Sequence, residues 1–283
     1  NVNFIMMQHT LFLFIMGLFS FIMADNQLVY HVPIQGTIDM GLPHYLQRVI
    51  GEAESEEAAA IIFDIDTFGG RVDAATQMKD IILDSKVTTV AFINKRAISA
   101  GALISLSCDS IFMTPGASIG AATAVDLQGK KASEKVISYM REEMASTAEA
   151  NNRFRNVASA MVDEELSISF IINSRGDTLT SKDVEGFSEG KLVTLSTNLA
   201  LLLEIADKQL NTIDDVLNHM NLQNAQKVEI KESWSEILVR FLTNPTVAPL
   251  FMSLGMLGLF FEIKSPGFGV PGILGLACLT LFF

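Results

Sequence analysis

The chain has 283 residues, with 20 Lys and Arg against 32 Asp and Glu and a formal net charge of -12, which is ample length for one large domain or two smaller ones. This acidic balance argues against nucleic-acid binding, because a protein that holds a phosphate backbone needs a positive surface. Two Cys and four scattered His fit neither a disulfide-rich scaffold nor a four-ligand zinc site, so we expect no metal and no cofactor.

The chain begins with a short apolar run. Mean hydropathy is +0.35 and only 18% of the residues are charged, which is more apolar than an ordinary soluble protein. We therefore expect the excess apolar residues to lie in particular segments. Leu11–Met23, followed by Ala24, is typical of a secretory signal peptide cleaved after Ala24, and an uncleaved anchor helix is the alternative. We predict one or the other over residues 1–24, which places the following domain on the extracytoplasmic side of a membrane.

The central part of the chain alternates segments of strand and helix character. The continuous apolar run Ala60–Ile65 is typical of a strand buried on both faces of a parallel sheet. Short links between such segments predict an α/β fold around a mostly parallel sheet. We predict strands over 28–34, 60–65, 87–93, 110–113 and 191–195, and helices over 41–57, 72–83, 98–108, 135–161 and 210–220.

A linker and a hydrophobic region follow this domain. Residues 223–244 have the pattern of an amphipathic approach to a membrane, with Trp234 and Phe241 suited to the interface; packing onto the domain is the alternative. Two uncharged stretches then flank a Gly- and Pro-containing turn near Glu262. Since a span takes about 20 apolar residues, we predict over 245–283 one membrane segment and the start of a second, in a region that is cut short.

One Gly-containing turn follows a predicted strand in the sequence DTFGGRVDAA, which includes Gly69 and Gly70. Paired glycines between a strand and a helix leave backbone N–H groups uncovered, and such groups can receive a developing oxyanion. The segment has neither the spacing of a dinucleotide-binding fingerprint nor the Gly-Lys-Ser/Thr of a Walker loop. A plain tight turn is the alternative.

A second turn, RAISAGALISL, places Ser99 where a strand leads into a helix. A serine in this position can be a nucleophile or a helix N-cap. A nucleophile needs a base, but His31, His44 and His219 lie in no motif that would make a Ser-His-Asp triad. The residues alone therefore favour the cap.

Lysine can replace histidine as the base where burial lowers its pKa. Lys130, Lys131 and Lys135 follow in GKKASEKVISYM. Lys135 is the best placed of the three, because it starts the predicted long helix beside Val136 and Ile137. For each of these lysines, a solvated surface charge is the alternative.

The chain resembles the membrane-bound serine proteases of the NfeD family. Four segments match in order, DTFGGRVDAA, ISAGA, TPGASIGAA and SEKVISYM, and the stretch from Asn244 to Gly275 resembles that family's first membrane segments. The resemblance implies a ClpP/crotonase-like fold of repeated ββα-type units over 25–222, followed by transmembrane helices. The family usually has Pro where this chain has Phe68, which leaves both glycines of the turn in place.

The resemblance also implies roles for individual residues. Ser99 is expected to be the nucleophile and Lys135 the general base of a Ser-Lys dyad, with the backbone N–H groups of Gly70 and Ala100 as the oxyanion hole. The implied protein is a homo-oligomeric endopeptidase that needs no cofactor and cleaves hydrophobic segments of stomatin-like membrane proteins. The residues expected to bind the extended substrate are Gly69, Ile119, Gly120 and Ala121.

Two other functions compete with the protease. A crotonase-type enzyme acting on acyl-CoA shares the fold and the oxyanion hole, but it needs neither Ser99 nor the hydrophobic ends of this chain. A catalytically inactive scaffold that organises partners at the membrane is the non-enzymatic alternative, although both Ser99 and Lys135 are present.

Overall fold

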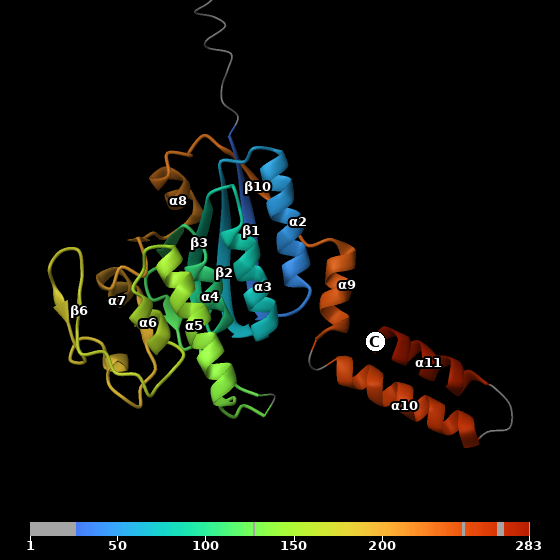
Figure 1. Cartoon of the computed structure of the whole chain (residues 1–283). Helices are drawn as coiled ribbons and strands as arrows, with labels where there is room; N and C mark the ends of the chain where they lie inside the picture. Colours follow the sequence, from blue (N-terminus) through green and yellow to red (C-terminus); the bar gives the residue numbers. More distant parts are fainter. Residues whose placement is uncertain (1–26, 127, 245–246, 265–268, 283) are drawn as a thin grey trace, which may run out of the picture.

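The computed structural model describes residues 27–126, 128–244, 247–264 and 269–282, and the predicted signal peptide or anchor over 1–24 lies outside them. An eight-stranded sheet forms the centre of the fold (Figure 1). Its strands are β1 (Leu28–Ile38), β2 (Ala60–Gly70), β3 (Thr89–Ile98), β4 (Ser110–Met113), β5 (Ser118–Gly120), β8 (Thr194–Ser196), β9 (Lys208–Gln209) and β10 (Gln226–Glu229).

The sheet is mostly parallel, which confirms the predicted α/β class. The main row has the strand order β10-β1-β2-β3-β4-β9, and every neighbouring pair in it is parallel. β3 pairs first with β4 and then, toward its carboxyl end, with β5. β5 in turn pairs with β8 in the antiparallel direction.

Helices cover both faces of this sheet. Side chains alternate along a strand, so Ile61 and Phe63 of β2 join the large core under the helices α2 and α3, whereas Ile62 faces α8 on the other side. Figure 1 shows α2, α3 and α5 over one face. The helices are α2 (Leu42–Ser55), α3 (Val72–Leu83), α4 (Ala100–Leu106), α5 (Glu134–Ala150), α6 (Arg155–Ala160), α7 (Thr197–Leu202) and α8 (Ile213–His219). A hairpin, β6 (Ile171–Ile172) and β7 (Thr178–Leu179), and a short 3-10 helix, η1 (Glu185–Phe187), complete the domain.

Several predicted elements were wrong in extent; for example, the strands expected over 28–34 and 87–93 continue to Ile38 and Ile98. Two further cases have a clear physical reason. The long helix expected over 135–161 is two helices, because α5 ends at Ala150 and the chain turns at Asn152, whose φ is 57°; Asn tolerates this left-handed conformation better than most residues. The strand expected over 60–65 continues to Gly70 as β2, since β1 pairs with it beyond the apolar run, up to Ile38 opposite Gly70.

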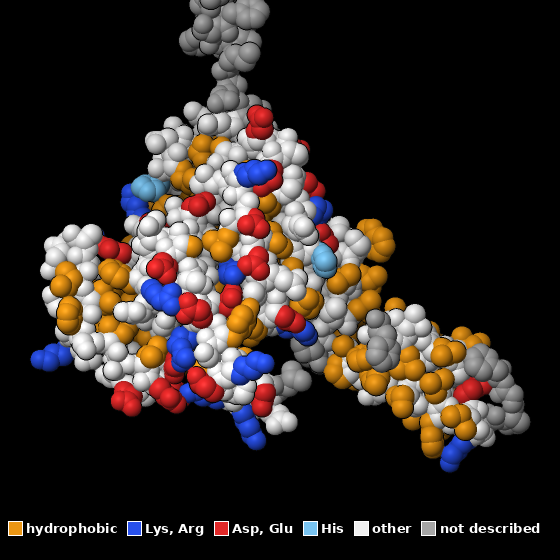
Figure 2. All heavy atoms as spheres, viewed as in Figure 1, with side chains coloured by type: hydrophobic (Ala, Val, Ile, Leu, Met, Phe, Trp, Pro, Cys, Tyr) orange, Lys and Arg blue, Asp and Glu red, His pale blue; other side chains and the backbone are white. Residues whose placement is uncertain are grey.

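The C-terminal part consists of the helices α9 (Trp234–Leu242), α10 (Ala248–Lys264) and α11 (Val270–Phe282). Among the described residues, no helix has both the length and the hydropathy that crossing a bilayer would take. α10 and α11 approach closely at glycines: a Cβ on Gly258 would lie 2.8 Å from the Cα of Gly275. The Glu262 carboxylate accepts hydrogen bonds from the N–H groups of Gly269 and Gly272 at the start of α11. Figure 2 shows hydrophobic side chains over most of this helix pair.

Candidate active site

Ser99 occupies a strained turn between β3 and α4. Its φ and ψ are 56° and -117°, a region that costs a residue with a side chain about 1–3 kcal/mol and that recurs at functional sites. A serine on a sharp, strained strand-to-helix turn is also the geometry of the hydrolase nucleophile elbow. Although Ser99 is the residue before α4, its side chain makes no capping hydrogen bond. The N-cap alternative therefore has no support in the structure.

The glycine turn lies directly against this serine. A Cβ on Gly69 would be 2.6 Å from the Ser99 Cβ and 3.1 Å from its Oγ, and the φ of Gly69 is +105°. A Cβ on Gly70 would overlap the carbonyl oxygen of Ile38. Only glycine fits at both positions. The two turns that the sequence singles out thus meet in space.

The Thr67 side chain holds the glycine turn in place by hydrogen bonds. Its Oγ1 accepts a hydrogen bond from the Gly69 N–H at 2.9 Å and lies 2.5 Å from the Gly36 carbonyl oxygen, to which it donates. A Cβ on Gly101 of α4 would lie 2.6 Å from the Thr67 Cγ2, so the helix that starts at the serine also packs on this threonine. No pattern in the sequence predicts this role for Thr67.

Two backbone N–H groups near Ser99, those of Gly70 and Ala100, are the predicted oxyanion donors. Ala100 is the first residue of α4, and the first N–H groups of a helix have no partner within it and carry a partial positive charge. The pairing of β2 with β3 ends at Thr67 opposite Ala97, so Gly70 lies beyond it. The oxyanion hole formed by Gly70 and Ala100 remains a prediction.

The segment Ile119–Ala121 supports the serine from the opposite side. The Ser99 N–H donates to the Gly120 carbonyl at 3.0 Å, and the Ala121 N–H donates to the Val193 carbonyl at 3.0 Å. Ile119 is fully buried in β5, which has β3 on one side and β8 on the other. These contacts position Ser99, and a role of this segment in binding substrate remains a prediction.

The three candidate lysines differ in their surroundings. Lys131 lies 3.2 Å from Glu164, whose carboxylate raises the pKa of Lys131 and so keeps it protonated, the opposite of what a base requires. Lys130 and Lys135 are both exposed, and neither side chain has a hydrogen bond or ion pair with residues in the described ranges. Lys135 is the second residue of α5, and its role as the base remains a prediction.

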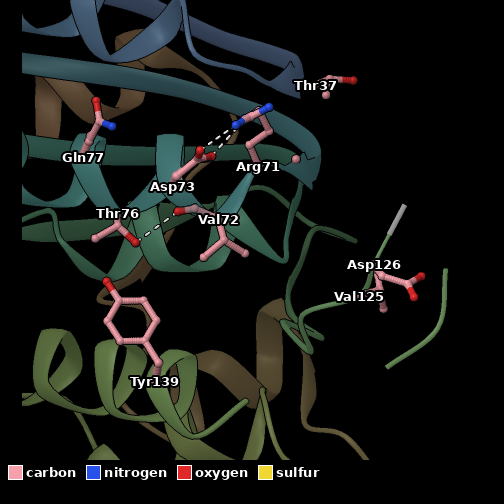
Figure 3. Close-up of a pocket in the computed structure, with 10 residues that line it drawn as sticks. Thr37, Arg71, Val72, Asp73, Thr76, Gln77, Val125, Asp126 and Tyr139 are labelled. Carbon is pink, nitrogen blue, oxygen red and sulfur yellow. Dashed lines mark hydrogen bonds and ion pairs between the residues drawn. The ribbon is translucent and has the colours of Figure 1, made fainter. Parts of the chain in front are cut away.

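A cavity of about 870 Å³ connects the glycine turn to α5, and this volume is within the range of ligand pockets. Figure 3 shows Tyr139 pointing from α5 toward α3, and Arg71 paired with Asp73. Arg71 holds the pKa of the Asp73 carboxyl below its usual value. Tyr139 lies one helical turn after Lys135 and so on the same side of α5. The lining residues are Thr37, Gly70, Arg71, Val72, Asp73, Thr76, Gln77, Val125, Asp126 and Tyr139.

An exposed aromatic ring stands beside the site. Phe68, next to Gly69, is 70% exposed, and the Arg96 guanidinium carbon lies 4.3 Å from its ring centroid. Asp66 holds Arg96 through an ion pair of 2.8 Å. This stacking fixes the Phe68 ring at the position where the NfeD-family proteases usually have Pro.

Fold and site together define an α/β domain with a strained serine, joined to a hydrophobic helix pair. The chain belongs to the NfeD1b family. The family model described as the NfeD1b N-terminal domain matches residues 28–230, and the model of the NfeD integral membrane domain matches residues 246–283. The chain is therefore a membrane protein, and the resemblance to the NfeD family is confirmed.

The chain is similar to two curated proteins and to a solved structure. It is 38% identical to membrane protein NfeD1b of Bacillus subtilis (strain 168), over 92% of this chain and 56% of that protein. It is 28% identical to membrane-bound protease PH1510 of Pyrococcus horikoshii, over 92% of this chain and 58% of that protein. The chain thus spans just over half the length of these relatives.

The solved structure is the 1510-N membrane-bound stomatin-specific protease, as a variant with one lysine replaced by alanine, in complex with a substrate peptide. The match covers 77% of this chain and 99% of the solved chain, with a TM-score of 0.61 and 23% sequence identity. A second structure, with one serine replaced by alanine, has a TM-score of 0.59 over 74% of this chain and 99% of that chain, at 23% sequence identity. This likeness shows that the fold is shared.

Proposed function

We propose that the protein is a membrane-bound serine endopeptidase with Ser99 as nucleophile and Lys135 as general base. The observation that carries the proposal is the strained backbone of Ser99 and its close packing against Gly69. A Cβ added to Gly69 would lie 2.6 Å from the Ser99 Cβ. A backbone strained at a serine that directly precedes a helix is typical of acyl-transfer sites. The similarity to PH1510, which is named a membrane-bound protease, also supports peptide-bond cleavage.

In the proposed mechanism, the neutral Lys135 amine takes the proton of the Ser99 hydroxyl as the Oγ attacks the peptide carbonyl. The N–H groups of Gly70 and Ala100 stabilise the oxyanion of the tetrahedral intermediate. The peptide C–N bond then breaks, and the leaving nitrogen takes the proton from Lys135. Water, deprotonated by Lys135, hydrolyses the Ser99 ester and releases the free hydroxyl.

The proposed substrates are hydrophobic segments of stomatin-like membrane proteins. The structurally similar 1510-N protein is a stomatin-specific protease. The apolar side chains of Val72 and Val125 at the cavity support an apolar substrate residue, with the extended chain running past Gly69 and the segment Ile119–Ala121. We further propose a homo-oligomer with the domain on the extracytoplasmic side, joined to transmembrane helices by the segment that follows β10, which ends at Glu229.

An inactive membrane scaffold is the second candidate. The exposure of Lys135 favours it, because a lysine base at neutral pH needs its pKa lowered by burial. The protease requires that a bound substrate covers this side chain. The two functions differ in whether Ser99 reacts.

The experiment is a cleavage assay on the full chain in lipid bilayers, with a hydrophobic polypeptide as substrate and a fluorophosphonate probe in parallel. We expect peptide products and a probe adduct on the Ser99 residue, both detected by mass spectrometry. Products without an adduct on Ser99 would assign the nucleophile elsewhere. Neither products nor adduct, in bilayers with an intact oligomer, would favour the scaffold.

Gly69 gives a test of the site's geometry. In Gly69→Ala the new Cβ meets the Ser99 Cβ at 2.6 Å, so we expect the serine to shift and cleavage to fall about 100-fold, the usual cost of a misplaced reactive group. Gly116→Ala is the matched control, since Gly116 also has a positive φ of +80° but no atom within 4 Å of its Cβ position. Equal cleavage rates for the two variants would contradict the contact.

A further inference from the structure

Helix α9 has a charged face that is bound to the domain. Its Glu236 pairs with Arg48 of α2 at 2.8 Å, and its Arg240 pairs with Asp39 at 2.9 Å. Arg240 also pairs with Glu232 just before the helix. The hydrogen bond from Arg48 lowers the pKa of Glu236 to about 2, so this pair stays charged at neutral pH.

The opposite face of α9 is apolar and largely exposed. At 3.6 residues per turn, Trp234, Leu238 and Phe241 lie opposite Glu236 and Arg240. Trp234 is 77% exposed, and no residue of α9 is buried. Exposed hydrophobic side chains in one patch normally mark a surface that contacts a partner or a membrane. Figure 1 places α9 between the domain and the helix pair α10 and α11.

The place of α9 in the chain, next to the membrane domain, indicates that a lipid bilayer covers its apolar face. The match to the integral membrane domain starts at residue 246, four residues after Leu242, where α9 ends. The Phe241 ring packs edge-on against the Phe251 ring of α10, with centroids 6.4 Å apart. The apolar face is therefore continuous with the membrane domain. A helix of this kind, with Trp on the apolar side, is typical of the headgroup boundary of a bilayer.

We propose that α9 lies along the lipid surface, with Trp234, Leu238 and Phe241 in the headgroup boundary, and holds the domain there by its charged face. Since the charged side chains of α9 point to the domain, the binding is hydrophobic and independent of lipid charge.

This docking also reaches the glycine turn. Arg240 Nη2 donates to the Thr37 carbonyl at 3.3 Å, and Thr37 pairs with Gly69 in the sheet. α9 is thus two contacts away from the backbone beside Ser99. Where the proposed protease function holds, the active site stays at a fixed height above the bilayer and receives the part of a substrate that emerges from it.

The chain has a single Trp, so intrinsic tryptophan fluorescence reports on α9 alone. The experiment reconstitutes the full chain in phosphatidylcholine vesicles with and without lipids brominated near the headgroup, and adds acrylamide as an aqueous quencher. We expect the bromolipids to lower Trp234 emission about twofold or more and acrylamide to quench it weakly. Vesicles with anionic lipid are expected to give the same result.

Matched variants separate the apolar face from exposed aromatics elsewhere. Phe241→Gln is expected to reduce bromolipid quenching, and Leu238→Gln to do the same. Phe170→Gln changes a ring of similar exposure, 57% against 54% for Phe241. Because Phe170 lies directly before β6, away from α9, this variant is expected to leave the quenching unchanged.

Three results would overturn the proposal. Strong acrylamide quenching without bromolipid quenching would place Trp234 in water. A blue-shifted emission that bromolipids do not quench and that shifts red on dilution would assign the face to a second copy of the chain. Quenching that only anionic vesicles support would make the attraction electrostatic. Because no readout uses cleavage, these outcomes are independent of the protease proposal.

Discussion

Replacing Ser99 by Ala is expected to lower peptide cleavage by at least about 10³-fold, the usual cost of losing a serine nucleophile. The variant retains the oxyanion donors but has no Oγ to form the acyl-enzyme. Cleavage is measured from product peptides by mass spectrometry, with the full chain in bilayers at equal protein concentration. A variant that cleaves at the parent's rate would remove Ser99 from the mechanism.

The fold of this variant is expected to be intact, because the Ser99 side chain makes no hydrogen bond with any residue that the structure describes. Ser99→Gly adds a second readout. Glycine adopts the 56°, -117° conformation without strain, so this variant is expected to be more stable than Ser99→Ala by about 1–2 kcal/mol, and equally inactive. Equal thermal stability of the two would show that the turn is not strained.

The base is assigned by comparing two lysines. Lys135→Ala is expected to be as inactive as Ser99→Ala, whereas Lys130→Ala retains the parent's rate. Lys135→Arg is also expected to be inactive, since a guanidinium stays protonated and cannot take the serine proton. Loss of cleavage in Lys130→Ala alone would move the base into the preceding loop.

The large elements could be predicted because their apolar patterns are long enough to be specific. Helix Val72–Leu83 has the predicted bounds, and β4 agrees over 110–113. Two of the missed strands are very short: β5 has three residues and β9 has two, too few for any periodicity. They are strands because a neighbouring strand pairs with them, which is a property of the fold and not of the segment.

The candidate site was predictable in its parts but not in its assembly. Each of the turns at Gly69 and Ser99 has a common structural explanation, and only their ordered occurrence with the later segments indicated a protease. The contact between Gly69 and Ser99 arises from two neighbouring parallel strands whose carboxyl ends meet. The Thr67 hydroxyl and the Val193 carbonyl each accept a hydrogen bond from a backbone N–H group, and such contacts leave no trace in a residue pattern.

Arg153 is the buried cation that holds the far end of α4, the helix that starts at Ser99. Its guanidinium donates to the carbonyls of Cys108 at 3.0 Å and Ile205 at 3.1 Å, and more weakly to that of Leu106 at 3.4 Å. Leu106 ends α4, where the partial negative charge of the helix favours a cation. Burial lowers the pKa of Arg153, but an arginine stays charged.

Arg153→Met is therefore expected to destabilise the domain by about 3–5 kcal/mol, because it leaves buried carbonyls without donors. The melting temperature falls by about 2–4 °C per kcal/mol for a domain of this size, measured by thermal unfolding of the full chain in detergent. Arg155→Met is the control: its ion pairs with Glu142 and Glu149 are exposed and contribute about 0–1 kcal/mol. If the two variants had equal melting temperatures, the hydrogen bonds of Arg153 would not stabilise α4, the helix that starts at Ser99. The support of Ser99 would then have to come from the sheet alone.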